Sequence, residues 1–237
     1  MLLVRTGAFA IAVGGGGGGA DLTENLVFWY KFNGNLNDSS GNGLTLTKFG
    51  DGTLAFAASD LDQALDLSTQ DYIVSGDASE INALANGFHI AIVAESPFGN
   101  TITLESLATS NILQIFAATN QEDIGIEFAY DNEGSPDVLT LEAARPSPNE
   151  PFLLEIFFSQ STNTVGISIN NGTFTTTALP GDAMTDFGSL SFGNIGFTGW
   201  RGEIDMAAAW SAPFPDLSPT GTERAALWNG GSFRADP

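Results

Sequence analysis

The feature that most constrains the fold is a succession of short apolar runs, each followed by turn-forming residues. Some runs alternate: Ile124, Ile126, Phe128 and Tyr130 are separated by Gly, Glu and Ala. Alternation of this kind is typical of a β-strand with one buried face and one wet face. The chain is therefore predicted to be all-β. The runs cover residues 26–32, 44–49, 88–94, 101–107, 112–117, 124–130, 152–158, 164–169, 190–195 and 204–210.

Turn chemistry predicts one hairpin directly. Asn170, Asn171 and Gly172 follow the run that ends at Ile169. An Asn-Gly pair supplies the positive φ angles of a type I′ turn, so a second strand is expected to begin at Thr173.

Helices are expected to be few and short. The 28 glycines favour tight turns over long helices. Only residues 78–86 and 222–229 have a helical pattern, and the second is predicted to be capped by Thr222 and ended by Gly230.

Composition narrows the classes of function. The net charge of −21 repels phosphate backbones and anionic lipids, which argues against nucleic acid as a partner. The same charge favours the binding of divalent cations. No apolar run approaches the ~20 residues that span a bilayer. The absence of cysteine excludes disulfides, thiolate metal sites and thiol catalysis. The single histidine, His89, has no second His or Cys with which to share a metal and is predicted to be a hydrogen-bonded sheet residue.

Residues 1–20 are predicted to be an anchoring arm, and residues 21–237 to be one sandwich domain. The arm joins an apolar stretch, 8–13, to six glycines, 14–19. A flexible glycine hinge is most useful between two bodies, so the arm is expected to pack on another structural protein chain in an oligomeric assembly. The alternative is a strand added to the domain's own sheet. A secretory signal is disfavoured because glycines follow the short apolar stretch instead of a cleavage site.

Three stretches resemble, in order, the laminin-G-like jelly rolls of the concanavalin A-like lectin and glucanase superfamily. Residues 26–43 are similar to the family's opening strand and its Asp-Ser-Ser-Gly-Asn turn. Residues 88–93 and 165–172 are similar to its paired inner strands, and residues 202–210 and 223–231 to its closing strand and carboxy-terminal helix. The resemblance implies a two-sheet antiparallel jelly-roll sandwich with a short C-terminal helix. It also implies adjacent first and last strands and a concave face that often holds sugars.

The resemblance further implies one structural calcium, because similar domains often hold it near the opening turn and the Asp of the closing strand. Asn33, Asp38, Asn42 and Asp205 are the candidate ligands, with Asn35 as a further oxygen source. A hard cation prefers several oxygen ligands. In the alternative interpretation, Asp38 and Asn42 only stabilise the turn and Asp205 accepts hydrogen bonds from backbone amides.

A complete catalytic set is not apparent along the closing strand. Glu203 and Asp205 alternate there, as the carboxylates of laminarinase-type glycoside hydrolases in this superfamily do. Retaining hydrolysis needs two carboxylates that flank the scissile bond. Here Met206, Ala207 and Ala208 follow, with no second Glu on the strand. We therefore predict no catalytic residues and no enzyme.

Trp200 and Arg201 are the candidate ligand-binding residues. Trp200 is flanked by glycines in the sequence FTGWRG, and an aromatic ring beside polar groups can hold a sugar. Trp29, Trp210 and Trp228 lie in strand or helix patterns and are predicted to belong to the core.

These observations favour a non-catalytic structural, decoration and adhesion domain. The leading hypothesis is a phage virion surface protein, such as a head decoration, fibre or tail component, with host glycans as candidate ligands. Two alternatives stay open: a glycoside hydrolase of the concanavalin A-like superfamily, and a secreted, extracellular carbohydrate-binding adhesin.

Overall fold

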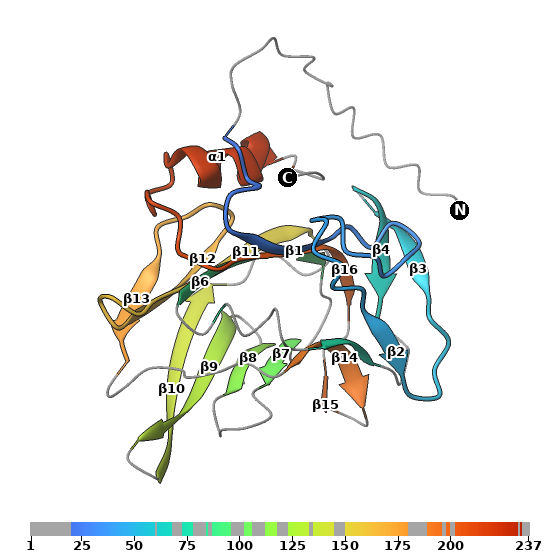
Figure 1. Cartoon of the computed structure of the whole chain (residues 1–237), viewed down its shortest axis with the longest axis horizontal. Coiled ribbons are helices and arrows are strands. Elements are labelled where there is room, and N and C mark those ends of the chain that lie inside the picture. The colour runs from blue at the N-terminus through green and yellow to red at the C-terminus, as the bar shows by residue number, and fades with distance from the viewer. Residues whose placement is uncertain are drawn as a thin grey trace.

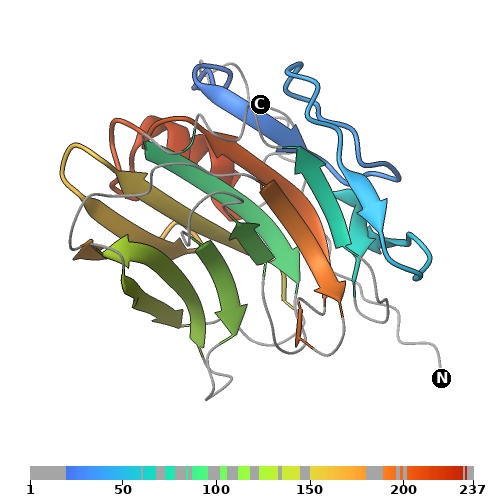
Figure 2. The ribbon, with the colours of Figure 1, turned by 60° about the horizontal axis from the view of Figure 1, so that its bottom comes forward.

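The computed structural model describes residues 20–59, 61–67, 73–77, 84, 87–95, 102–105, 112–117, 123–132, 135–144, 150–179, 189–195, 198–199, 202–231 and 233. The described strands form two eight-stranded antiparallel sheets stacked on each other (Figures 1 and 2). One short α-helix lies near the C-terminal end. The prediction of an all-β, two-sheet antiparallel sandwich with a short C-terminal helix is confirmed.

Sheet A lies beneath the helix (Figure 1). Its strands are β1 (Leu26–Tyr30), β3 (Phe56–Ser59), β4 (Asp62–Asp66), β6 (Gly87–Glu95), β11 (Phe152–Ser159), β12 (Thr164–Ile169), β13 (Thr175–Ala178) and β16 (Glu203–Trp210). They are ordered β13-β12-β11-β6-β16-β4-β3, and β1 pairs with β16.

Sheet B forms the second layer. Its strands are β2 (Thr47–Phe49), β5 (Ile73–Asp77), β7 (Ile102–Glu105), β8 (Ile112–Ala117), β9 (Asp123–Asn132), β10 (Ser135–Ala144), β14 (Ser189–Ile195) and β15 (Thr198–Gly199). They are ordered β10-β9-β8-β7-β14-β5-β2, with β15 beside β14.

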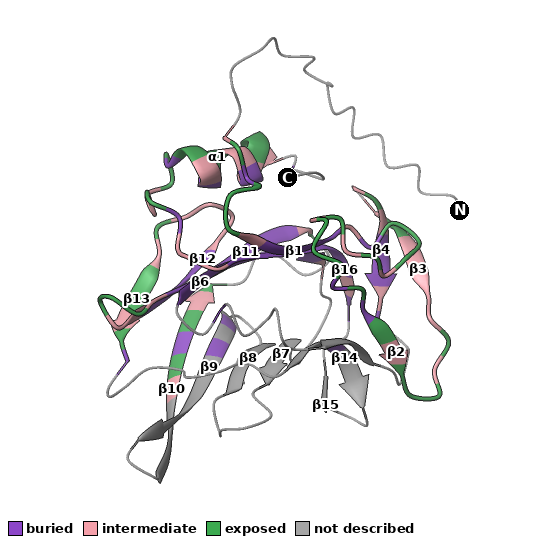
Figure 3. Cartoon of the chain, viewed as in Figure 1, coloured by how far each residue is buried: buried purple, intermediate pink, exposed green. Residues whose placement is uncertain are grey.

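The central strands of sheet A are buried on both faces. In β6, Ile90 and Ile92 point into the core between the sheets, whereas Ala91 and Val93 point to the outer face, the one away from sheet B. Helix α1 (Thr222–Trp228) and its flanking segments cover that outer face, and Figure 3 shows the buried strands beneath it. Burial on both faces explains why β6 and β11 read as nearly continuous apolar runs.

The first and last strands are neighbours, as the resemblance implied. Trp29 pairs with Ala208 and Tyr30 with Ala207 in an antiparallel register. The two inner strands were expected to pair with each other, and this is wrong: β11 lies between β6 and β12 and pairs with both. β11 is long enough and apolar enough to occupy the buried position between them.

The predicted hairpin joins β12 to β13, but its turn lies one residue earlier than expected. Positive φ angles occur at Asn170 (51°) and Asn171 (56°), and the N–H of Gly172 donates to the carbonyl of Ile169 at 2.9 Å. The central pair is therefore Asn-Asn, which also tolerates positive φ. Gly172 is needed for a different reason: a Cβ there would lie 2.9 Å from the Ile169 carbonyl oxygen.

The predicted C-terminal helix is present with different ends. Gly221, not Thr222, is the N-cap, and no side chain caps the helix. A Cβ at Gly221 would collide with the carbonyl of Asp216, so close packing decides the residue there. Asn229 ends the helix in a left-handed conformation with φ 44°, ahead of Gly230.

The described residues end on one side of the sandwich. Ala20, the last residue of the predicted arm, and Phe233 both pack in the layer on the outer face of sheet A. Arm residues 1–19, most of the predicted helix 78–86, and both Trp200 and Arg201 lie outside the described residues. Within the described parts of the chain, no helix is long and apolar enough to cross a membrane.

Candidate functional site

The carboxylate of Asp38 holds the opening turn. Its Oδ1 accepts from the N–H groups of Trp29 (3.0 Å) and Ser40 (2.9 Å). Its Oδ2 accepts from the Ser40 hydroxyl (2.7 Å) and the N–H of Leu44 (3.1 Å). These bonds form an Asx-type turn and fasten it to the edge of β1.

The two asparagines predicted as calcium ligands are exposed and lie at either end of the turn. The side-chain amide of Asn42 donates to the carbonyls of Leu26 (2.8 Å) and Val27 (3.0 Å). The Oδ1 of Asn33 accepts from the amide of Asn35 at 3.1 Å. Both residues thus stabilise the turn in the structure.

The fourth predicted ligand, Asp205, is buried on β16. Asp38 lies at the opposite edge of β1 from β16, because the N–H of Trp29 points to it. Asp205 lies beyond the last β1–β16 pair, Tyr30 with Ala207. Among the described residues, no group of three or more His, Asp or Glu side chains is arranged to hold a metal. The calcium stays a prediction that would depend largely on amide and carbonyl oxygens.

Three carboxylates lie side by side across sheet A, an arrangement that we call the carboxylate row. Glu203 of β16 is opposite Asp66 of β4 on one side and Glu95 of β6 on the other. The next residue, Ile204, belongs to the core between the sheets, so alternation places the row on the outer face. Opposed residues have Cβ atoms about 4.5–5.5 Å apart. Glu203 and Asp205 are visible along the closing strand in the sequence, and the register of the sheet adds Asp66 and Glu95 to them.

The carboxylate row changes the chemistry of Glu203. Its partial burial, and then the charges of Glu95, Asp66 and Asp205, raise the pKa of this carboxyl. A carboxyl with a raised pKa can donate a proton near neutral pH more readily than an ordinary one. The carboxylate row therefore brings a carboxyl with a raised pKa beside two further carboxyl groups on the outer face of sheet A.

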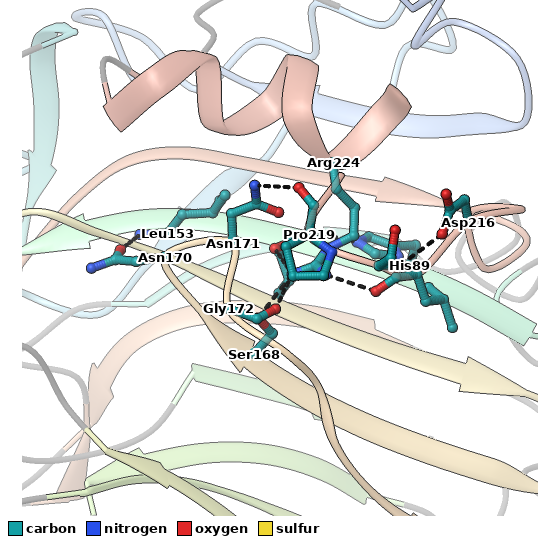
Figure 4. Close-up of polar contacts among 12 residues, drawn as sticks. His89, Leu153, Ser168, Asn170, Asn171, Gly172, Asp216, Pro219 and Arg224 are labelled. Atoms are coloured by element: carbon teal, nitrogen blue, oxygen red, sulfur yellow. Dashed lines mark hydrogen bonds and ion pairs between the residues drawn. The ribbon is translucent and has the colours of Figure 1, made fainter. Parts of the chain in front are cut away.

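A buried ion pair lies at the other end of the outer face. Arg224 of α1 reaches Glu155 of β11 through two bonds, Nε to Oε1 at 2.9 Å and Nη2 to Oε2 at 2.7 Å. Figure 4 shows Arg224 extending from the helix toward Ser168, Gly172 and His89 beneath it. Its remaining donors meet the Ser168 hydroxyl and the carbonyls of Gly172 and Leu217, at 2.7 to 2.9 Å. Every side-chain group of this pair is excluded from solvent.

His89 completes this buried group. Its Nε2 lies 3.2 Å from the Oε1 of Glu155, and its ring stacks on Phe214 with centroids 3.9 Å apart. Burial opposes the charged form of Glu155, but hydrogen bonds from His89 and Arg224 outweigh it and lower the pKa of that carboxyl. The prediction that His89 is a hydrogen-bonded sheet residue is confirmed for Nε2. Its Nδ1 is buried and has no hydrogen-bond partner among the described residues.

The tryptophans divide as predicted where the structure describes them. Trp29 and Trp210 are buried in the outer layer, edge to face with centroids 5.9 Å apart. Trp228 is half-buried against the same layer. The predicted ligand-binding pair, Trp200 and Arg201, lies outside the described residues and stays a prediction.

No protein-family model and no curated protein matches the chain. Solved structures do match. The binding domain of Paraclostridial Mosquitocidal Protein 1 is 14% identical with a TM-score of 0.67, over 87% of this chain and 53% of that one. A structure of botulinum neurotoxin type C, described as dependent on two ganglioside molecules for cell entry, is 15% identical with a TM-score of 0.63, over 88% and 51%.

A smaller domain matches along nearly its whole length. Domain 4 of AbnA, a GH43 extracellular arabinanase from Geobacillus stearothermophilus solved with arabinotriose, is 18% identical with a TM-score of 0.56. The match covers 85% of this chain and 98% of that domain. The chain spans about half the length of the toxin binding domains that it matches. At these identities the likeness shows a shared β-sandwich fold.

Proposed function

We propose that this chain is a non-catalytic carbohydrate-binding and adhesion domain. The observation that carries the proposal is the match to nearly the whole of the arabinanase domain, which was solved with arabinotriose. The toxin domains add a second group of sandwiches of this fold, one described with two ganglioside molecules. Because a shared fold does not determine function, the ligand has to be tested on this chain itself.

We place the domain on an assembled surface, held by its arm, with a virion head decoration, fibre or tail component as the leading setting. Ala20 and Leu22 support this, because they fix the start of the domain on the outer face of sheet A. A segment that precedes them would leave from that face. The extracellular adhesin is the alternative setting, and host glycans are the ligands expected in both.

A glycan array probed with the purified full chain tests the proposal. It should include arabino-oligosaccharides and ganglioside oligosaccharides, because arabinotriose and gangliosides are named for the matched proteins. Selective, saturable binding to one class is expected. Trp200→Ala should weaken that binding, and Trp228→Ala, which changes a half-buried tryptophan of the outer layer, is the matched control. An array without any saturable signal would contradict glycan binding.

A glycoside hydrolase is the second candidate, and the carboxylate row favours it. Glu203, with its raised pKa, would be the acid, and Asp66 or Glu95 would be the base or nucleophile. Release of reducing sugar from β-glucan or arabinan would support this candidate only if Glu203→Gln abolishes it. Turnover that survives Glu203→Gln would come from elsewhere.

A further inference from the structure

The residues after β16 form a layer over sheet A without adding a strand to it. We call residues 211–231 together with Phe233 the C-terminal strap. Figure 1 shows α1 and its flanking segments lying across the outer face of the sheet. The strap covers an apolar surface that includes Trp29, Val93, Leu153 and Trp210. Without the strap, this surface would be exposed to water, which carries a large free-energy cost.

The buried side-chain hydrogen bonds of the strap converge on one arginine. Arg224 bonds to Glu155 in the sheet, to Ser168 and Gly172 at the β12–β13 turn, and to Leu217 within the strap (Figure 4). One further bond joins the strap to that turn, from the Asn171 amide to the Pro219 carbonyl at 2.8 Å. At its other end, the N–H of Ser211 donates to the carbonyl of Asn25 at 2.9 Å. Among the described residues, the ion pair of Arg224 with Glu155 is the charged centre that fastens the strap.

His89 of β6 contacts the same carboxylate from the sheet side. Its Nε2 and the Nε of Arg224 both meet Oε1 of Glu155. Since a carboxylate only accepts, the neutral imidazole must carry its proton on Nε2, and Nδ1 holds a lone pair. Phe214 of the strap stacks directly on the ring.

A second proton on His89 would disturb every part of this arrangement. It would create an N–H on the buried Nδ1, which has no acceptor among the described residues. It would also add a positive charge that shares Glu155 with Arg224. The charged groups that face His89 are Glu155 from β11, and Arg224 and Glu223 from α1, while β16 and the Phe174 and Phe214 segments contribute aromatic rings.

The balance of these groups favours the neutral imidazole. Burial is the largest influence and lowers the pKa of His89, while the hydrogen bond and the charge of Glu155 oppose it and Arg224 reinforces it. The folded protein therefore binds this proton more weakly than the unfolded chain does. The same linkage applies to any partly opened state in which water reaches the ring.

We propose that the strap is an acid-sensitive latch: protonation of His89 loosens the C-terminal strap from sheet A and exposes the aromatic layer beneath it. This latch is independent of the proposed carbohydrate binding. It requires only the buried group and the strap that Arg224 fastens. In mildly acidic surroundings the sandwich would stay folded while the strap opens.

Hydrogen exchange of the full chain at about pH 7.5 and about pH 5 tests the latch, with rates corrected for intrinsic pH dependence. Protection of the α1 amides should fall at least about tenfold at the lower pH, while the amides of β6 and β11 stay protected. His89→Gln is the matched variant, because its side-chain amide can still donate to Glu155 but does not titrate. It should keep the α1 protection at both pH values.

The single histidine gives a second readout that does not depend on the variant. The imidazole NMR signals can come only from His89, so its titration midpoint can be compared with the pH at which α1 loses protection. Protection of α1 should begin to fall near the ordinary imidazole pKa of about 6.5, where an opened strap takes up the proton, and should stop falling near the titration midpoint of His89 in the folded protein. Unchanged α1 protection in acid, an equal loss in His89→Gln, or a fall that starts only below that midpoint would each overturn the latch.

Discussion

Arg224 and Glu155 form a two-point ion pair, with donor–acceptor distances of 2.7 and 2.9 Å, wholly buried between helix α1 and strand β11. The pair joins the C-terminal strap to the centre of sheet A. Removing one member would leave a charge in a place that water does not reach. Because an unpaired buried charge is costly, the intact pair strongly favours docking of the strap on sheet A.

Arg224→Met should therefore be strongly destabilising, by about 3–5 kcal/mol in the free energy of unfolding. Urea unfolding followed by tryptophan fluorescence measures the loss. The double change Glu155→Leu with Arg224→Met should recover much of it, because it removes both charges. A double variant as unstable as the single one would show that lost packing, not the unpaired carboxylate, causes the effect.

Glu203→Gln should stabilise the protein at neutral pH. The pKa of Glu203 is raised in the folded state, so its negative charge near pH 7 destabilises the fold. This destabilisation disappears below the pKa of the unfolded chain, about 4.5, where the carboxyl is protonated in both states. Thermal unfolding should show a higher Tm for the variant at about pH 7 and nearly equal values at about pH 4. Glu24→Gln, at an exposed position outside the row, is the control. An equal Tm for variant and native chain at neutral pH would contradict the prediction, because it would mean that other interactions offset the charge of Glu203 in the row.

Calcium, if bound, should raise the melting temperature, and a chelator should reverse the rise. Asp205→Asn tests the ligand set that the resemblance implies: loss of most of the response would make Asp205 a ligand, and an unchanged response would put the ion on the amide and carbonyl oxygens of the opening turn. Asp38→Asn is not a clean test, because that carboxylate also accepts four hydrogen bonds of the turn. A melting curve that is identical with calcium and with chelator would leave the turn with a structural role only.

Removing residues 1–19 should leave a cooperatively folded sandwich while abolishing assembly. The first side chains with described packing are Ala20 and Leu22, and the carbonyl of Leu22 accepts from the Trp210 indole at 2.8 Å. The truncated chain keeps both, so its Tm should match that of the full chain. Sedimentation should show an oligomer for the full chain and a monomer after truncation. Loss of the fold would indicate that the arm is an internal strand.

Much of the sandwich could be predicted from the sequence, because alternation and turn residues are local signals. The neighbourhood of β1 and β16 required the family resemblance, since these strands lie at opposite ends of the chain. The place of β11 between β6 and β12 could not be predicted. All three are apolar runs, and their order depends on packing across the whole sheet.

The candidate sites were less predictable than the fold. The carboxylate row joins residues from three strands, and only the register reveals it. Glu155 did leave a signal: it is one carboxylate within the apolar run FLLEIFF, and a buried charge requires a partner. With only 7 Lys and Arg in the chain, few candidates could serve, but the sequence does not say that Arg224 is the one.

The most direct test of the central claim measures binding and turnover together. Arabinotriose, and separately a ganglioside oligosaccharide, would be titrated into the full chain in a calorimeter, and the recovered sugar would then be weighed by mass spectrometry. Saturable heat is expected for one of these sugars, and that sugar should be recovered intact. Cleavage of the sugar by the native chain but not by Glu203→Gln would contradict a non-catalytic domain. The absence of binding heat for both sugars would contradict carbohydrate binding.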